Sequence, residues 1–191
     1  MALLEAWQAK TNLIAPSTLG DIWRRHVADS AQLVPLGGGA RRWIDLGSGA
    51  GFPGLVVAIL LAERGEGTVT LVESNAKKAA FLRTVIAETG APAILRHERI
   101  ESVLKQSLPS VDIVTARALA SLDRLCILAA PFVARGARCL FHKGRGFERE
   151  IEEAARSWTM DVEKHPSLTE ADGRIIEIRA LIAHRGTGIP S

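Results

Sequence analysis

The sequence predicts an α/β fold in which a mixed, seven-stranded sheet is flanked by helices. Two patterns indicate this fold. Short β-type runs alternate with helix-type runs from residue 41 to residue 142, as in proteins with helices on both faces of a parallel sheet. The last two β-type runs read as a hairpin, which makes the sheet mixed. At 191 residues, with 47 % hydrophobic and 24 % charged, the chain has the composition of one globular domain.

The N-terminal part is predicted to be a helical cap. Apolar periodicity indicates helices over residues 1–10 and 18–34, and Thr18 followed by Asp21 resembles a capping box. One face of the second helix is expected to be buried; near it fall Leu19, Ile22, Trp23, His26, Val27 and Leu33. The glycine run at 37–39 separates the cap, residues 1–38, from one compact domain over residues 39–191.

The elements of that domain follow in order. β-type runs are expected at 41–46, 68–73, 93–96, 111–116 and 137–142, with a terminal hairpin of 161–164 and 174–182. Helices are expected at 54–64, 76–90, 100–106, 122–135 and 147–158. Asn75 is the predicted N-cap of the second of these helices, because its side chain can accept hydrogen bonds from free backbone N–H groups.

Composition and charge exclude several classes of protein. The net charge is only +3, so any attraction for nucleic acid must come from a local patch. Two cysteines are too few for a disulfide framework and lack metal-site spacing, so we expect reduced thiols and no metal. The most apolar run, 55–62, is far shorter than the ~20 residues that span a bilayer, and residues 1–10 do not resemble a signal peptide. We therefore expect a cytoplasmic protein, and a monomer.

The clearest functional signal is a glycine-rich loop between the first strand and the first helix of the alternating region. It reads Asp45-Leu-Gly-Ser-Gly-Ala-Gly-Phe-Pro-Gly54. Glycines allow a tight turn and let a ligand approach the main chain without obstruction by Cβ atoms. In open α/β sheets, ligands bind beyond the carboxyl ends of the strands. The loop therefore marks a small-molecule site.

The residues around the loop narrow the class of ligand. The lysine of a phosphate-binding loop is missing, and Phe52 stands where a dinucleotide fingerprint has its third small residue. Asp45 would repel phosphates and suits a ligand with a cationic group. Glu73, at the end of the second strand, can accept hydrogen bonds from both hydroxyls of a ribose. A ribose, a positive centre and no phosphate together describe S-adenosylmethionine.

Five ordered segments resemble the small-subunit ribosomal RNA methyltransferase G family, also called glucose-inhibited division protein B. The Gly-Phe-Pro-Gly ending of the glycine loop and the segment Arg-Ala-Leu-Ala-Ser at 117–121 are the most specific. One departure is Glu73, where many relatives have the chemically equivalent Asp. The matching segments are the loop at 45–54, His26-Val-Ala-Asp29-Ser30, Asn75 to Arg83, Arg99-Ile100-Glu101, and Thr115 to Leu122 with the later Lys143-Gly144.

The resemblance implies a class I S-adenosylmethionine-dependent methyltransferase with a Rossmann-like fold. The family transfers a methyl group to N7 of a guanine in the decoding-region loop of 16S ribosomal RNA, leaving S-adenosylhomocysteine. The expected partner is small-subunit ribosomal RNA or the ribosomal particle. Guanine N7 already has an in-plane lone pair, so the reaction needs orientation and no general base. No catalytic residue is assigned beyond two positioning residues, Arg117 and Lys143.

The resemblance also implies roles for the site residues. Gly47, Gly49 and Gly51 would carry the methionine part of the cofactor, with Asp45 before them and Phe52 lining the pocket. Further cofactor contacts are Glu73 at the ribose, Ile100 and Glu101 beside the adenine, and Arg117 at either the cofactor carboxylate or an RNA phosphate. Lys143 would contact the RNA or guanine O6.

Basic residues supply the candidate RNA contacts. The segment 135–149 has five positive residues against Glu148, a local charge of +4, and from it Lys143, Arg145 and Arg149 are assigned to RNA. A solvated basic face is the alternative. His26 either reaches a phosphate or is a structural partner of Asp29. A second basic group comprises Arg24, Arg25, Arg41 and Arg42, and the possible stacking aromatics Trp23, Phe52 and Phe141 read as core.

Three other functions remain open on the sequence. A small-molecule methyltransferase of the same fold would keep its activity when Arg145 and Arg149 are removed. A non-catalytic S-adenosylmethionine-binding regulator would bind the cofactor without turnover. A dinucleotide-dependent oxidoreductase fits least, because of the carboxylate at Asp45.

Overall fold

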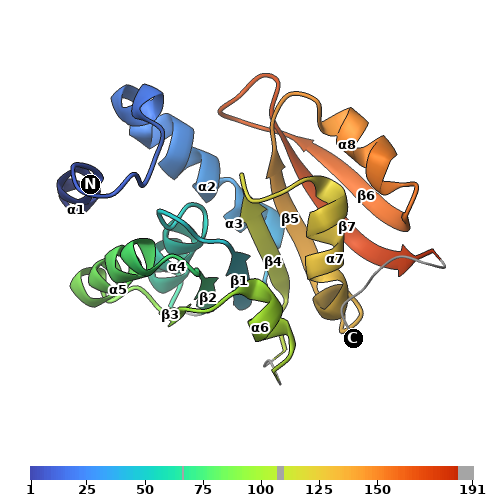
Figure 1. Cartoon of the computed structure of the whole chain (residues 1–191), viewed down its shortest axis with the longest axis horizontal. Helices are drawn as coiled ribbons and strands as arrows, with labels where there is room; N and C mark the ends of the chain where they lie inside the picture. The colour runs from blue at the N-terminus through green and yellow to red at the C-terminus, as the bar shows by residue number, and fades with distance from the viewer. Residues whose placement is uncertain (66, 107–109, 185–191) are drawn as a thin grey trace.

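One mixed sheet of seven strands organises the molecule (Figure 1). The computed structural model describes residues 1–65, 67–106 and 110–184. The strand order is β3-β2-β1-β4-β5-β7-β6. The first five strands of the chain pair in parallel, whereas β7 runs antiparallel to β5 and pairs with β6 as a hairpin. The predicted mixed sheet with a terminal hairpin is thereby confirmed.

The strands begin and end close to their predicted positions. The ends of the first five strands in the chain differ from the predicted ends by no more than two residues. The first strand of the terminal hairpin is longer than expected. Their bounds are β1 Arg42–Leu46, β2 Thr68–Val72, β3 Ala93–Arg96, β4 Ile113–Arg117, β5 Arg138–Lys143, β6 Trp158–Pro166 and β7 Arg174–Ala183.

The helices of the main domain also follow the prediction, with one correction. The helix expected at 147–158 ends at Ala154, because Trp158 pairs with Ala183 and starts β6. The Asn75 cap is confirmed, since its Oδ1 accepts hydrogen bonds from the amides of Lys77 and Lys78. The bounds are α4 Gly54–Glu63, α5 Ala76–Thr89, α6 Ile100–Leu104, α7 Leu122–Val133 and α8 Phe147–Ala154.

The N-terminal region is helical, but it is not the continuous helix expected over 18–34. After α1, Ala2–Gln8, it consists of a 3₁₀ turn η1, Pro16–Asp21, a π-helical turn η2, Trp23–Ala28, and the short helices α2, Asp29–Ala31, and α3, Leu33–Gly37. The capping box is wrong: Thr18 lies inside η1, where its hydroxyl donates to the Ala15 carbonyl. The expected apolar face is confirmed only in part: Ile22, His26 and Leu33 are buried, whereas Leu19 is 40 % and Trp23 is 66 % exposed.

The core lies on both faces of the sheet. Along β1, Trp43 belongs to one buried cluster and Ile44 to the other, as alternation along a strand requires. Helices α6, α7 and α8 pack on the Ile44 side, and α4 and α5 on the Trp43 side. The N-terminal region joins the second cluster, where Trp7 meets Phe81 of α5 edge to face at 5.8 Å between ring centroids.

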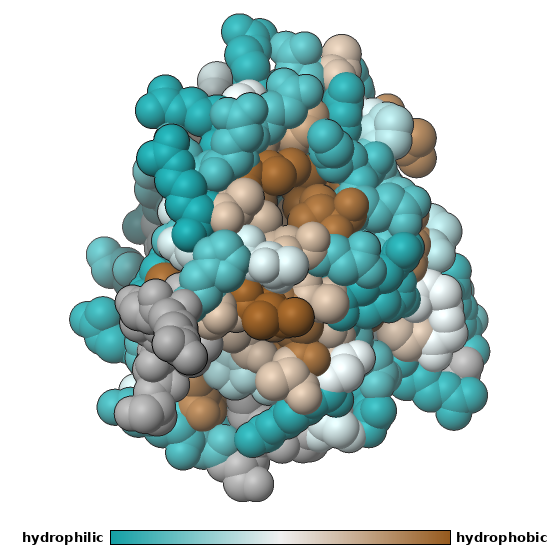
Figure 2. Space-filling model, turned by 90° about the vertical axis from the view of Figure 1, so that its right-hand side faces the viewer, coloured by the Kyte–Doolittle hydropathy of each residue, from teal (hydrophilic) through white to brown (hydrophobic). Residues whose placement is uncertain are grey.

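The face that carries α8 and the β6–β7 hairpin is largely hydrophilic around a hollow of apolar atoms (Figure 2). No helix in the described ranges is long and apolar enough to cross a membrane.

The order in which the chain adds strands to the sheet reverses between the parallel neighbours β1 and β4. The chain passes from β1 to β2 on one side and returns to β4 on the other. A crevice opens at such a reversal, beyond the carboxyl ends of the strands. The glycine loop after β1 and the segment after β4 both lie there, so the fold positions them as the walls of one site.

Candidate functional site

Two cavities meet at the reversal between β1 and β4. The larger has a volume of about 580 Å³ and extends toward the N-terminal region, and the smaller, of about 300 Å³, lies toward β2 and α6. Gly47, Gly49, Lys78 and Ala118 line both. The two cavities therefore form one site with two compartments, called below the large and the small cavity.

The backbone of the glycine loop is left-handed at three positions. Gly47, Gly49 and Gly51 have φ values of +68°, +57° and +84°, a region that residues with a Cβ rarely adopt. A Cβ on Gly47 would lie 2.6 Å from Cδ1 of Leu119. Gly47 and Gly49 line the cavities, whereas Gly51 lines neither and packs against Leu55.

Asp45 lies beneath this loop and lines neither cavity. Its Oδ1 accepts a hydrogen bond from the Thr115 hydroxyl at 2.8 Å, and its backbone carbonyl accepts one from the Ser48 hydroxyl. Burial raises the pKa of the Asp45 carboxyl to about 6. In the part of the chain that the structure describes, its Oδ2 has no hydrogen-bond partner. Asp45 thus braces the loop from below, where the sequence suggested a direct ligand contact.

Glu73 closes the small cavity at the end of β2. Its Oε2 accepts the Gly49 amide at 2.8 Å and its Oε1 the Asn75 amide at 2.6 Å. A carboxylate has about four acceptor sites, so these two bonds leave capacity for two ligand hydroxyls. Ile100 and Glu101 line the same cavity, and the Glu101 carboxylate is paired with Arg124 at 2.6 Å.

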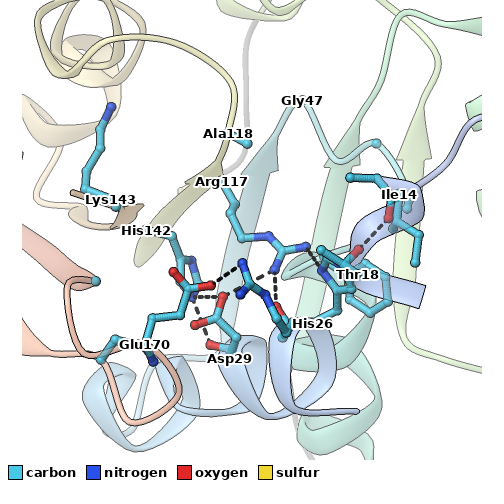
Figure 3. Close-up of a pocket in the computed structure, with 18 of the residues that line it drawn as sticks. Ile14, Thr18, His26, Asp29, Gly47, Arg117, Ala118, His142, Lys143 and Glu170 are labelled. Carbon is cyan, nitrogen blue, oxygen red and sulfur yellow. Dashed lines mark hydrogen bonds and ion pairs between the residues drawn. The ribbon is translucent and has the colours of Figure 1, made fainter. Parts of the chain in front are cut away.

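Arg117, at the end of β4, points into the large cavity toward the N-terminal region (Figure 3). Its Nη1 donates to Asp29 Oδ2 at 3.2 Å and to the Arg25 carbonyl at 3.0 Å, and its Nη2 donates to Nδ1 of His26 at 2.8 Å. The Phe52 ring lies 5.4 Å below the guanidinium and stacks on His26 at 5.0 Å. The structure therefore brings together Phe52, His26 and Arg117, which were predicted separately.

His26 contacts Arg117 and Thr18, and the structure gives it no direct bond to Asp29. Its Nε2 lies 2.8 Å from the Thr18 hydroxyl. Burial, and then the Arg117 charge, lower the pKa of His26 to about 4, so the ring is neutral near pH 7. A neutral ring can accept the hydrogen bond that the Arg117 guanidinium donates.

His142, on β5, is a site residue to which the sequence assigned no role. Its Nε2 donates to the Asp29 carbonyl at 2.9 Å and lies 3.5 Å from Asp29 Oδ2. Burial lowers its pKa, so this ring is neutral too. Strand alternation predicts that His142 and Lys143 point to different faces of β5. It does not predict that Asp29, from the N-terminal region, lies against the His142 side chain. The side chains of Gln32 and Thr169 complete the contacts of Asp29.

Lys143 points away from the Arg117 group (Figure 3). Its ammonium donates to Glu150 Oε2 at 2.6 Å and to the Ala120 carbonyl at 2.7 Å, and its side chain is buried. It thereby holds the segment after β4, in which Ala118 has a φ of +52°. A positive φ in a residue other than glycine stores backbone strain, which here lies at the wall of both cavities.

Arg145 and Arg149 are both exposed and both paired with carboxylates. Arg145 contacts Asp172 at 2.9 Å and Arg149 contacts Glu153 at 2.8 Å. Neither residue lines the large cavity. Of the predicted aromatics, Phe141 is buried in the core as expected, whereas Trp23 is exposed.

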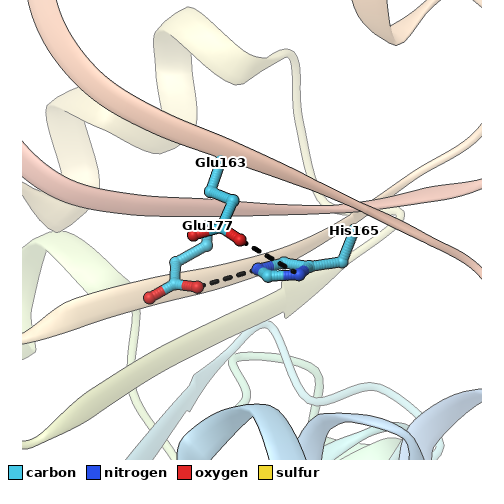
Figure 4. Close-up of side chains that lie close together, drawn as sticks. All are labelled: Glu163, His165 and Glu177. Atoms are coloured by element: carbon cyan, nitrogen blue, oxygen red, sulfur yellow. Dashed lines mark hydrogen bonds and ion pairs between the residues drawn. The ribbon is translucent and has the colours of Figure 1, made fainter.

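A second polar cluster lies on the hairpin, away from the cavities. Glu163, His165 and Glu177 place one potential metal-ligand atom each within 4.8 Å of one another (Figure 4). Two arginines already pair with these carboxylates, Arg138 with Glu177 and Arg179 with both glutamates. The cluster is thus an ion-pair network whose negative charge is balanced by protein groups.

Comparison with known proteins gives one consistent result. Residues 1–179 match a family described as rRNA small subunit methyltransferase G. A ribosomal RNA small subunit methyltransferase G from Rhodopseudomonas palustris (strain HaA2) is 49 % identical over 182 residues, covering 95 % of this chain and 77 % of the relative. One from Brucella canis (strain ATCC 23365 / NCTC 10854 / RM-666) is 50 % identical over 179 residues, covering 94 % and 84 %.

Solved structures share the fold at low identity. A mutant of MtNAS in complex with S-adenosylmethionine superposes with a TM-score of 0.62 at 18 % identity, over 93 % of this chain and 72 % of that one. A putative O-methyltransferase from Klebsiella pneumoniae gives a TM-score of 0.60 at 14 % identity, over 94 % and 89 %.

Proposed function

The chain belongs to the rRNA small subunit methyltransferase G family, and on that premise we propose how its residues bind and orient the reactants. It is an S-adenosylmethionine-dependent methyltransferase of small-subunit ribosomal RNA that acts on N7 of a guanine. Its fold is the Rossmann-like class I methyltransferase fold.

The two cavities fit S-adenosylmethionine. Glu73 offers free acceptor sites for the ribose hydroxyls, and Ile100 and Glu101 flank the space for the adenine. Gly47 and Gly49 leave the backbone open where the methionine part would pass between the cavities. When bound, the cofactor supplies an electrophilic methyl group on a sulfonium. Asp45 and Gly51 act on the shape of the loop that holds it.

The large cavity receives the guanine. Methylation of N7 needs no prior removal of a proton, so the residues of this cavity have to orient the base and exclude water. Phe52 presents a ring that is already stacked on His26 and covered by Arg117. Arg117 is charged and half-buried, and three hydrogen bonds fix its direction. We assign it to an anionic group of the substrate or cofactor.

Ribosomal RNA supplies the polyanionic partner. His26, Lys143, Arg145 and Arg149 are the RNA contacts proposed from the sequence, and Arg145 and Arg149 would exchange their carboxylate partners for phosphates. Either naked 16S RNA or the small ribosomal subunit would serve as substrate. Such a substrate places the reaction in the cytoplasm, and we propose that a monomer carries it out.

The observation that carries this proposal is the meeting of the two cavities at Gly47, Gly49 and Ala118. It is tested by incubating the protein with methyl-labelled S-adenosylmethionine and either unmodified small subunits or 16S RNA. We expect one label per RNA, at N7 of one guanine, and loss of labelling in Glu73→Ala. Label on another base atom would overturn the assignment. Cofactor binding without transfer to any RNA would favour a regulator instead.

A further inference from the structure

Two cations share one aromatic ring at the outer edge of the site. The guanidinium of Arg174, at the start of β7, lies 5.3 Å from the centroid of the Phe147 ring, and the ammonium of Lys164, on β6, lies 6.0 Å from it. Phe147 starts α8 and is buried, so the ring is a fixed base for both cations. We call Arg174, Lys164 and Phe147 the Phe147 patch.

The charges of the Phe147 patch are not balanced by acidic side chains. Within the described ranges, neither Arg174 nor Lys164 forms an ion pair, although the nearby carboxylates of Glu150, Asp172 and Glu170 each hold another cation. Two like charges over one ring repel each other, and among the described residues no carboxylate pairs with either of them. The patch is therefore a local positive potential that the small total charge conceals.

Arg174 is oriented by the backbone and keeps donors to spare. Both of its hydrogen bonds come from Nη1, to the carbonyls of Ala171 and Gly173. A guanidinium has five N–H donors, so Nε and Nη2 remain able to grip two oxygens of one anion. Carbonyl bonds on one side fix its direction, which lowers the entropy lost when an anion binds.

The Phe147 patch adjoins the large cavity. Arg174, Gly173 and Gly144 are among the residues that line that cavity. From these observations we propose that the patch binds a backbone phosphate of the ribosomal RNA strand whose guanine enters the large cavity. The proposal rests on the function proposed above and adds two contacts, Arg174 and Lys164, that charge counting along the sequence did not mark.

The test compares Arg174→Gln/Lys164→Gln with the wild type. The probe is a fluorescently labelled 16S RNA transcript, titrated from low to moderate salt. Each lost phosphate contact lowers the slope of log affinity against log salt by about 0.7 to 0.9. Because the patch binds one phosphate, we expect a slope lower by about 0.7 to 0.9 and an affinity about tenfold weaker. With the RNA as substrate, KM rises while kcat and S-adenosylmethionine affinity stay unchanged, because a remote phosphate contact contributes equally to substrate and transition state.

Arg64→Gln/Arg135→Gln is the matched control. It removes the same charge from two exposed residues that follow the C-terminal ends of α4 and α7. Arg174→Lys, with Lys164 intact, keeps the charge but cannot grip two oxygens, so it should keep the wild-type salt slope and lose part of the affinity. Equal losses in the test and control pairs, or an unchanged salt slope in the test pair, would overturn the patch. Failure of the wild type to methylate any RNA would instead overturn the proposed function.

Discussion

Gly47 meets two constraints that a larger residue cannot meet together. Its φ of +68° is left-handed, and a Cβ there would lie 2.6 Å from Leu119 Cδ1. Leu119 lines the small cavity, so the side-chain shift that a Cβ on Gly47 requires would reshape the wall of that cavity. We expect Gly47→Val to weaken S-adenosylmethionine binding by at least about 100-fold, since clash and lost backbone approach together exceed about 3 kcal/mol.

Calorimetric titration of S-adenosylmethionine measures this effect. Gly39→Val is the control, because a Cβ on Gly39 meets nothing within 4 Å and the residue is far from the cavities. Circular dichroism shows whether each variant is folded. Wild-type affinity in a folded Gly47→Val protein would place the cofactor elsewhere.

At the scale of single residues, the sequence predicted which side chains lie at the ligand-binding edge better than it predicted which residues they contact. Glu73 and Arg117 could be predicted at the ligand edge because both end strands that lead to it. His142 could not, since its partner Asp29 is 113 residues away and lies in the N-terminal region. Lys143 was predicted at the site, but its bond to Glu150, which turns it toward the segment after β4, depends on the packing of α8.

Among the helices, α5 shows most directly how a local signal fixes an element. The Asn75 side chain accepts the Lys77 amide at 3.0 Å and the Lys78 amide at 3.1 Å, and thus satisfies two of the free donors at the start of α5. Asn75→Ala should lower the free energy of unfolding by about 1 kcal/mol. Urea unfolding followed by circular dichroism measures this change.

Asn75→Ser provides the comparison, since serine is also a good N-cap and should recover most of the loss. The Asn75 amide, which donates to Glu73, is a backbone group and remains in both variants. Equal stability of the wild type and the alanine variant would mean that water replaces the cap without cost.

The region 18–34 shows the limit of such local signals. Its sequence indicates a helix, yet the structure divides it into 3₁₀, π and α turns. Two of the contacts that accompany this division are distant in the chain: Arg24 donates to the Thr169 carbonyl, and Arg25 pairs with Glu170 at 2.8 Å. Neither contact has a counterpart in sequence periodicity, so helical content was predictable and the register of turns was not.

At the scale of the whole molecule, the sequence predicts the parallel part of the sheet. The alternation of strands and helices and the glycine loop after β1 indicate it. Parallel strands need crossovers of a dozen residues or more, which the helices between them provide. The closure of the site was not predictable in this way. Asp29, in α2, accepts hydrogen bonds from three side chains: Gln32 just after that helix, Arg117 on β4, and Thr169 in the β6–β7 connection. One buried carboxylate thus joins three distant segments around the large cavity.

The contribution of His26 to the stability of the chain is sensitive to mild acid. The folded state holds His26 with a pKa of about 4, below its usual 6.5, so between these values the unfolded chain binds a proton that the folded chain does not. The stabilisation from a neutral His26 is complete above pH 6.5 and is lost as the pH falls toward 4. Asp45, with its pKa raised to about 6, acts in the opposite sense, because its folded form retains a proton that the unfolded form loses.

A comparison of variants separates the two effects. Between pH 7.5 and pH 4.5, the wild type should lose about 2 kcal/mol more unfolding free energy than His26→Gln, which keeps polar groups at the site but cannot titrate. Urea midpoints at the two pH values measure this difference. His184→Gln, which changes an exposed histidine after β7, should follow the wild type at both pH values. Parallel loss in the wild type and His26→Gln would contradict the argument, because His26 would then not carry the proton-linked difference between the folded and unfolded chain.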